Sequence, residues 1–277
     1  MQGFSVSAVA AVLDFAVLKP NQTSADIDSA AALCGQLSIG CLCVQPNDVC
    51  RAARLLHKQK TVVASVVGFP HGANATAIKV HEARIAIEDG ARELDMVLAL
   101  QALREGDHTT VHDDIAAVVN EGSASDVAVK VILETCYLNE DEIIHACRIA
   151  ESAGATFVKT STGFGSRGAT PEVVRTMLNT VDGRIGVKAY LALRHAVPLV
   201  EELRSCGLGR LPRSGGLGRL PRRHLPPAIC LPRRHRHEGV HLREPPCDEL
   251  AAEAEHHLKF ASIGRTVVVA LEGPRLG

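Results

Sequence analysis

The sequence contains 277 residues, with 30 Lys and Arg against 31 Asp and Glu and a formal net charge of −1. This length fits one large α/β domain with a substantial core, and the balanced charge excludes a protein drawn electrostatically to nucleic acid or to a membrane surface. There is no run of about 18 apolar residues that would span a bilayer, so the sequence predicts no membrane partner.

Seven short apolar runs, rich in β-branched residues, follow one another through residues 1–190. Each is followed by a turn and a helix-like stretch, and successive runs lie roughly 20–35 residues apart, the size of a βα unit. The runs are Val12–Leu18, Ile39–Val44, Val62–Phe69, Leu94–Leu100, Val127–Leu133, Thr156–Thr160 and Ile185–Ala189. The helical stretches include Ala77–Glu88, Asp113–Asn120, Glu140–Ser152 and Pro171–Val181. Seven such units favour an α/β fold of the (β/α)8 TIM barrel type over an open doubly wound sheet.

After about residue 195 the sequence changes character. Residues 204–246 are rich in Arg, Pro, Gly and His, and their prolines exclude a continuous helix or central strand. We therefore divide the chain into a barrel at 1–195, an irregular segment at 196–247, and a short helix with a candidate strand, Thr266–Leu271, at 248–277. The eighth barrel strand is expected to be missing or replaced by this tail.

Three lysines lie inside or at the end of apolar runs: Lys130, Lys159 and Lys188. A single lysine of this kind is more often a side chain that reaches solvent or a structural ion pair. Three on neighbouring strands favour a site, because burying an ammonium group is costly. A lysine attacks a carbonyl only as the neutral amine. We expect Lys159 to be the nucleophile and Lys188 to lower its pKa from the adjacent strand.

Two carboxylates raise the same question as the lysines. Asp95 lies within an apolar run on the expected fourth strand, and Asp14 lies within the first. A buried carboxylate needs an ion-pair partner or a role in proton transfer. We expect Asp95 to relay protons, while for Asp14 a salt bridge to a lysine is an equally good interpretation.

A glycine-rich loop follows the expected sixth strand. Residues 163–168 satisfy the G-x-G-x-x-G pattern of dinucleotide-binding folds. The loop lies at the sixth βα unit rather than the first, and Asp182 precedes the next strand instead of following it, so that interpretation is disfavoured. Glycines before a helix suit anion binding, and Gly163, Phe164 and Gly165 are candidate contacts to a substrate phosphate.

The ordered motifs of residues 12–190 resemble the deoxyribose-phosphate aldolase family. They include Cys43-Val44-Gln45-Pro46, Val67-Gly68-Phe69-Pro70, Glu93-Leu94-Asp95-Met96-Val97, Lys130-Val131-Ile132-Leu133-Glu134-Thr135, Phe157-Val158-Lys159-Thr160-Ser161-Thr162-Gly163-Phe164 and Gly186-Val187-Lys188-Ala189. The resemblance implies a (β/α)8 barrel with no metal and no organic cofactor, located in the cytoplasm. It also implies reversible cleavage of 2-deoxy-D-ribose 5-phosphate, a small phosphorylated sugar, to acetaldehyde and D-glyceraldehyde 3-phosphate.

The resemblance also assigns roles to single residues. Lys159 matches the Schiff-base lysine, and Asp95 and Lys188 match the proton-relay pair. Asp14, Lys130, Cys43 and Thr160 are expected to support them. Gly163 and Phe164 match the start of the family's contacts to the substrate phosphate.

The sequence departs from the family after Ala189. The family continues its seventh-strand lysine with Ala-Ser-Gly-Gly-Ile/Val-Arg, whereas here Tyr190, Leu191 and Ala192 follow. The Gly-Thr-Ser-Ser-like end of the eighth strand is not found either. Backbone N–H groups approach a phosphate most closely where glycine removes the Cβ atom. We therefore expect impaired use of phosphorylated substrate.

The sequence is also compatible with other functions. An inactive relative that acts as a binding or scaffold subunit would explain the divergent end, and homo-oligomer formation is compatible with either interpretation. Nucleic-acid binding through residues 204–246 is disfavoured because the segment lacks aromatic residues for base stacking. Metal binding by the histidines near the end, such as His235 and His237, is disfavoured because no carboxylate support is evident.

Overall fold

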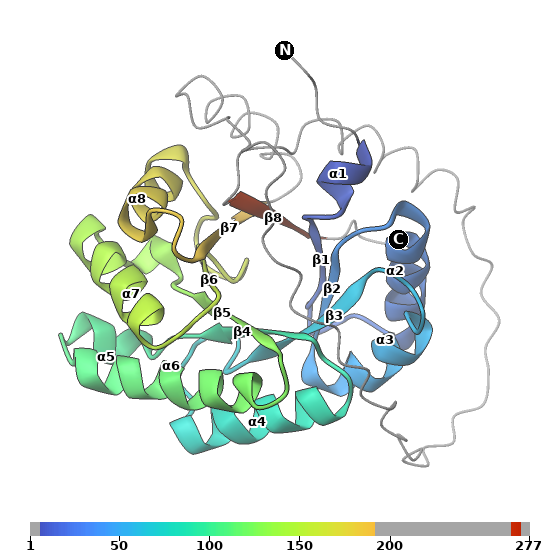
Figure 1. Cartoon of the computed structure of the whole chain (residues 1–277), viewed down its shortest axis with the longest axis horizontal. Helices are drawn as coiled ribbons and strands as arrows, with labels where there is room; N and C mark the ends of the chain where they lie inside the picture. Colours follow the sequence, from blue (N-terminus) through green and yellow to red (C-terminus); the bar gives the residue numbers. More distant parts are fainter. Residues whose placement is uncertain (1–5, 192–266, 273–277) are drawn as a thin grey trace.

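The computed structural model describes residues 6–191 and 267–272, which form a closed parallel barrel with helices around it (Figure 1). The predicted (β/α)8 barrel is confirmed. The predicted irregular segment at 196–247 and the predicted helix after it lie outside the described residues. Among the described helices, none is long and apolar enough to cross a membrane.

Eight strands form the barrel, and each pairs in parallel with the next in chain order. They are β1 (Asp14–Val17), β2 (Cys41–Val44), β3 (Val62–Val67), β4 (Glu93–Val97), β5 (Ala128–Ile132), β6 (Phe157–Lys159), β7 (Gly186–Leu191) and β8 (Val267–Glu272). The α-helices are α1 (Val6–Ala10), α2 (Ser24–Leu37), α3 (Val49–Leu55), α4 (Thr76–Glu88), α5 (Leu100–Arg104), α6 (His108–Ser123), α7 (Glu140–Ser152) and α8 (Pro171–Val181). Short 3-10 helices η1 (Pro46–Asp48) and η2 (Thr135–Tyr137) follow β2 and β5.

The eighth strand comes from the end of the chain. β8 pairs in parallel with β7, where Val187 is level with Val267, and with β1, where Asp14 is level with Ala270. The predicted strand at 266–271 thus coincides with β8 to within one residue at each end. Its two ladders close the barrel.

Capping residues explain where several helices begin. Asn139 accepts a hydrogen bond from the N–H of Glu142 at 2.9 Å, and the Glu142 carboxylate accepts one from the N–H of Asn139 at 2.8 Å, a capping box that starts α7. Thr170 caps α8, with Pro171 at its first position. Helix α6 begins five residues before the predicted stretch, because Asp107 accepts hydrogen bonds from Thr110.

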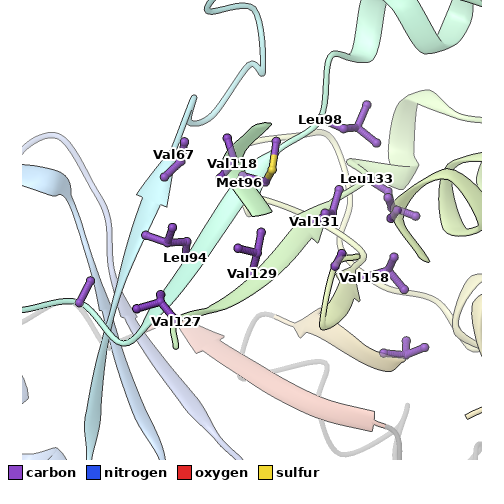
Figure 2. Close-up of a cluster of buried hydrophobic side chains, with 14 of the residues drawn as sticks. Val67, Leu94, Met96, Leu98, Val118, Val127, Val129, Val131, Leu133 and Val158 are labelled. Carbon is purple, nitrogen blue, oxygen red and sulfur yellow. The ribbon is translucent and has the colours of Figure 1, made fainter. Parts of the chain in front are cut away.

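Side chains alternate along the strands between two layers. Leu94, Met96, Val129, Val131 and Val158 belong to the large apolar cluster that packs the sheet against the helices (Figure 2). The intervening positions face the lumen, where a second cluster contains small residues: Ala16, Leu18, Cys41, Cys43, Ala64 and Val66. Because side chains in a strand alternate with a period of two, Asp14, Asp95, Lys130, Lys159 and Lys188 fall on this lumen face.

We predict that Gly72→Ala destabilises the loop after β3. Gly72 has φ +68°, and a Cβ atom there would lie 2.0 Å from the carbonyl oxygen of Leu98. Gly106→Ala is the control, because Gly106 has φ +77° and open space around it. In chemical denaturation, Gly72→Ala should lower the free energy of unfolding by at least about 2 kcal/mol more than Gly106→Ala does. Equal losses would mean that backbone strain alone, and not the close approach to β4, requires glycine.

Candidate active site

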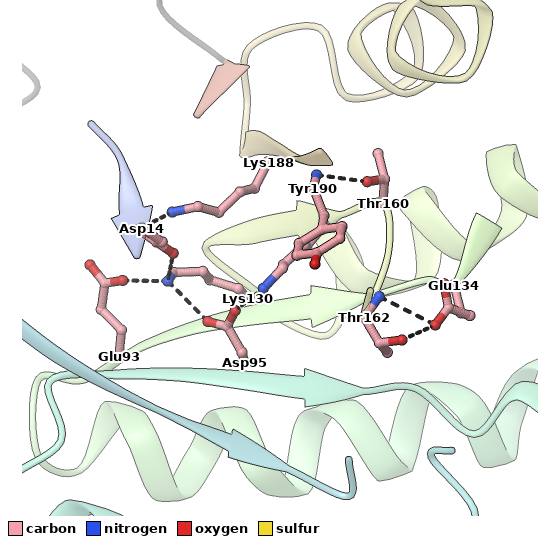
Figure 3. A network of polar contacts seen from close by, with 10 residues as sticks. Asp14, Glu93, Asp95, Lys130, Glu134, Thr160, Thr162, Lys188 and Tyr190 are labelled. Carbon is pink, nitrogen blue, oxygen red and sulfur yellow. Dashed lines mark hydrogen bonds and ion pairs between the residues drawn. The ribbon is translucent and has the colours of Figure 1, made fainter. Parts of the chain in front are cut away.

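A chain of alternating charges crosses the barrel lumen (Figure 3). The ammonium group of Lys188 contacts one oxygen of Asp14, and the other oxygen of Asp14 lies 2.8 Å from Lys130 Nζ. Lys130 Nζ lies 2.9 Å from Asp95 Oδ1, and Asp95 Oδ2 lies 2.5 Å from Lys159 Nζ. Glu93 adds a third carboxylate on Lys130, at 2.5 Å. We call these six residues the lumen charge network; three are cationic and three anionic.

Burial makes the balance of this network essential. Lys130 and Lys159 are 1% exposed, Lys188 is 3% exposed, and Asp95 is fully buried. Each ion would cost several kcal/mol to desolvate without a partner. Lys130 stands at the centre, with three carboxylates within 2.9 Å. Attraction to Asp14, Asp95 and Glu93 outweighs burial and raises the pKa of Lys130 well above its usual value.

The predicted nucleophile, Lys159, is the last residue of β6 and therefore lies towards the carboxyl end of the barrel strands, where such barrels carry their active sites. Burial lowers the pKa of Lys159, but the adjacent Asp95 carboxylate more than offsets this and the net shift is upward. Burial raises the pKa of the Asp95 carboxyl, but the neighbouring lysines, Lys130 first among them, outweigh burial. The net shift of the Asp95 pKa is therefore downward. The Asp95 carboxylate thus favours the ammonium form of Lys159.

This corrects the expectation that a neighbouring cation leaves Lys159 with a lowered pKa. Lys159 and Lys188 are level with each other on adjacent strands, as predicted. Their ammonium groups, however, contact different carboxylates, Asp95 and Asp14. Attraction to Asp95 outweighs the repulsion from other lysines, of which Lys130 is the one that most lowers the Lys159 pKa.

The two remaining supporting residues occupy different layers. Cys43 belongs to the lumen cluster, and burial raises the pKa of its thiol to about 12, so the group stays protonated. Thr160, the residue after Lys159, accepts a hydrogen bond on Oγ1 from the N–H of Tyr190 at 3.0 Å. Thr160 therefore connects the end of β6 to the end of β7.

The predicted phosphate loop is anchored by a residue for which the sequence indicated no role. Glu134, at the end of β5, is buried and accepts hydrogen bonds from the N–H and the hydroxyl of Thr162. The Thr162 hydroxyl oxygen in turn accepts a hydrogen bond from the N–H of Phe164 at 3.0 Å. The N–H of Phe164, one of the residues predicted to contact phosphate, thus has a partner within the loop. Burial raises the pKa of Glu134.

Two aromatic contacts shape the mouth of the barrel. Phe164 meets Phe69, which follows β3, edge to face with ring centroids 5.3 Å apart. Tyr190 lies against Gly163, so closely that a Cβ atom on that glycine would fall 2.5 Å from the tyrosine Oη. The Phe69 contact joins loops from two strands that are not neighbours, which is why sequence spacing did not reveal it.

Within residues 6–191 and 267–272, one group of side chains has metal-ligand character: Asp14, Cys41 and Glu93, whose donor atoms lie within 4.8 Å of one another. The ammonium group of Lys130 already lies against both carboxylates, at 2.8 and 2.5 Å. Burial also raises the pKa of the Cys41 thiol well above its usual value, and only a thiolate is a good ligand. These residues fit a lysine better than a metal ion.

A closed βα barrel whose lumen holds a strand-end lysine against a carboxylate is the arrangement expected of an aldolase of the lysine-dependent class. The sequence matches the family described as DeoC/LacD family aldolase over residues 8–192. The chain therefore belongs to this family.

Individual relatives agree with this assignment. A deoxyribose-phosphate aldolase from Thermococcus gammatolerans is 48% identical over 188 residues, which is 67% of this chain and 84% of the relative. Among solved structures, the aldolase QR15 is 40% identical with a TM-score of 0.65, covering 70% of this chain and 87% of that one. A tetrameric deoxyribose phosphate aldolase from Aeropyrum pernix is 28% identical with a TM-score of 0.63, covering 67% and 78%.

We predict that Asp14→Asn destabilises the protein by about 3–5 kcal/mol at neutral pH, because it leaves Lys188 and Lys130 short of a buried partner. The lysines lower the pKa of Asp14 despite its burial. A lowered pKa contributes stability above the unfolded-state value of about 3.9, and this stability is lost as pH falls further. The difference in unfolding free energy between the two proteins should therefore stay constant from pH 7 to about pH 5 and narrow as the pH falls below about 3.9.

The exposed Asp113 supplies the control for this measurement. Asp113→Asn should change the unfolding free energy by less than about 0.5 kcal/mol at either pH. A constant gap between wild type and Asp14→Asn at all pH values would contradict a charged Asp14 in the folded lumen.

Proposed function

We propose that the chain is a deoxyribose-phosphate aldolase. It would cleave 2-deoxy-D-ribose 5-phosphate reversibly to acetaldehyde and D-glyceraldehyde 3-phosphate through a Schiff base on Lys159. The observation that carries the proposal is the buried Lys159 ammonium group, 2.5 Å from the Asp95 carboxylate. Relatives at up to 48% identity with this activity in their names support the substrate.

The reaction begins with the amine of Lys159. Having lost a proton, Nζ adds to the aldehyde carbon of the open-chain sugar and forms a carbinolamine. The carbinolamine hydroxyl leaves as water after protonation, which produces an iminium ion. Asp95 is the carboxylate in contact with Nζ, so we assign to it the transfer of protons to and from this centre.

Carbon–carbon cleavage uses the iminium ion as an electron sink. The C3 hydroxyl loses its proton and its oxygen becomes the aldehyde oxygen of the leaving product. The C2–C3 bond breaks, its electron pair forms a C1=C2 double bond, and the C1=N π pair moves onto the nitrogen, which gives an enamine. D-Glyceraldehyde 3-phosphate leaves. Protonation at C2 restores an iminium ion, and water then releases acetaldehyde and the free amine.

The lumen charge network suits this sequence because an iminium ion, like an ammonium ion, is cationic. Replacing one by the other leaves Asp95 paired and the network neutral. Lys188 reaches Asp95 through Asp14 and Lys130 in the unliganded site. We assign to Lys188 the second position of the proton relay, since it is level with Lys159 on the neighbouring strand.

An inactive scaffold subunit is disfavoured by the same residues. All three lysines, Asp14 and Asp95 are present and buried, and Glu93 is partly buried. Such a network would be a costly feature to retain without chemistry. The tetrameric relative from Aeropyrum pernix supports self-association of this chain. A cytoplasmic location stays a prediction.

The proposal predicts covalent trapping on Lys159. Incubation with deoxyribose 5-phosphate or acetaldehyde, followed by borohydride, should reduce the iminium ion and leave an adduct on the peptide that contains Lys159. Mass spectrometry locates it. Lys159→Arg keeps a cation beside Asp95 but should give no adduct. Lys60→Ala, at an exposed lysine, should react like the wild type. A folded wild-type protein that gives no adduct with either compound would contradict the proposal.

The pairing of Lys159 with Asp95 predicts a pH effect. Because the carboxylate raises the Lys159 pKa, Asp95→Asn should lower it, by about 1–3 units for a close opposite charge. The rate of trapping by acetaldehyde and borohydride, scaled to the maximum of each protein, should therefore rise at lower pH in the variant. Asp113→Asn is the matched control. A profile that stays in place, or moves to higher pH, would contradict the assignment.

A further inference from the structure

Tyr190 occupies the lumen face one layer beyond the lysines. It follows Lys188 by two residues on β7, and the strand alternation places both side chains on the same face. Its backbone is held at both ends: its N–H donates to Thr160 Oγ1 at 3.0 Å, and its carbonyl oxygen accepts from the N–H of Ala169 at 3.0 Å. The side chain is buried, at 6% exposed.

The ring of Tyr190 lies against the loop at residues 163–165, which the sequence makes a candidate for contact with the substrate phosphate. A Cβ atom on Gly163 would lie 2.5 Å from both Cζ and Oη of the tyrosine and 2.8 Å from Cε1. Gly163 has φ +91°, so glycine is required there for its backbone as well. In Figure 3, Tyr190 lies between the charged groups around Lys130 and the Thr162–Glu134 contact that anchors this loop.

A phosphate that approached Gly163 from the lumen would meet this ring. The phosphate carries up to two negative charges and requires closely spaced N–H donors or cations in exchange for its hydration. The buried ring supplies no N–H donor and no cation, and the tyrosine hydroxyl offers one donor at most. An aldehyde without phosphate has no group to place against this loop.

We propose that Tyr190 is a specificity-determining residue that restricts the use of phosphorylated sugars. The ring lowers kcat/KM for phosphorylated sugars relative to kcat/KM for unphosphorylated deoxy sugars and short aldehydes. This inference rests on the proposed aldolase function and concerns which substrates its site prefers. The ring, rather than the hydroxyl group, is the discriminating element.

The experiment compares kcat/KM for 2-deoxyribose 5-phosphate with kcat/KM for 2-deoxyribose in four proteins. In Tyr190→Ser, the ratio of phosphorylated to unphosphorylated substrate should rise at least about tenfold over the wild type. In Tyr190→Phe, which keeps the ring, the ratio should stay within about twofold of it. Tyr137→Ser removes the chain's other tyrosine, which is exposed, and should leave the ratio unchanged.

A second measurement needs no variant. Inorganic phosphate should be a poor competitive inhibitor of 2-deoxyribose cleavage by the wild-type protein, because the ring covers the loop. Strong competitive inhibition would overturn the inference. So would an unchanged ratio in a folded Tyr190→Ser, or an equal rise in Tyr190→Phe.

The two proposals fail in different ways. If no protein cleaves either sugar and Lys159 forms no adduct, the aldolase function is wrong and the inference falls with it. If both sugars are cleaved and substitution of Tyr190 leaves the ratio of kcat/KM values unchanged, only the role of Tyr190 is wrong.

Discussion

In the barrel lumen, the ammonium group of Lys130 lies within 2.9 Å of Asp14, Asp95 and Glu93, and the remaining charges depend on this contact. Without it, Asp14 and Asp95 would face Lys188 and Lys159 as separate buried pairs, with one lysine fewer than there are carboxylates. The lumen tolerates these ions because small residues such as Ala16, Cys43 and Ala64 leave them room and the six charges cancel. An apolar core of equal volume would be as stable or more so. The network is therefore best explained by chemistry that needs a cation held close to a carboxylate.

The direction of the pKa shifts changes how that chemistry is understood. Repulsion between two ammonium groups is one way to produce a neutral amine. The position of Lys159 and Lys188 on adjacent strands suggested this mechanism. In the folded lumen, attraction to Asp95 is stronger, and it favours the ammonium form of Lys159. The pairing is then preserved when the nitrogen becomes an iminium ion, so the electrostatic environment suits the covalent intermediate as well as the unliganded site.

Much of the barrel could be predicted because its signals are local. Apolar β-branched runs marked the strands, and capping residues such as Asn139 and Thr170 marked helix starts to the residue. The identity of the buried lysines followed from the cost of desolvation. The ion pairs could not be predicted in this way. Asp14 and Lys130 are 116 residues apart in sequence, and nothing local indicates which carboxylate each lysine contacts. Glu134 and Phe69 were missed for a related reason, since each contacts a residue that follows another strand: Thr162 after the neighbouring β6 for Glu134, and Phe164 for Phe69.

The way β8 completes the barrel has a consequence for how the chain folds. All earlier strands meet a neighbour a few tens of residues away, whereas residues 192–266 separate β7 from β8, and β8 must also reach β1. The entropy of closing such a loop grows only slowly with length, but contacts of high sequence separation form late. During synthesis and refolding, the seven-stranded portion therefore exists with the edges of β1 and β7 unpaired. Unpaired parallel edges attract other chains, so aggregation and dependence on chaperones should be decided at this step.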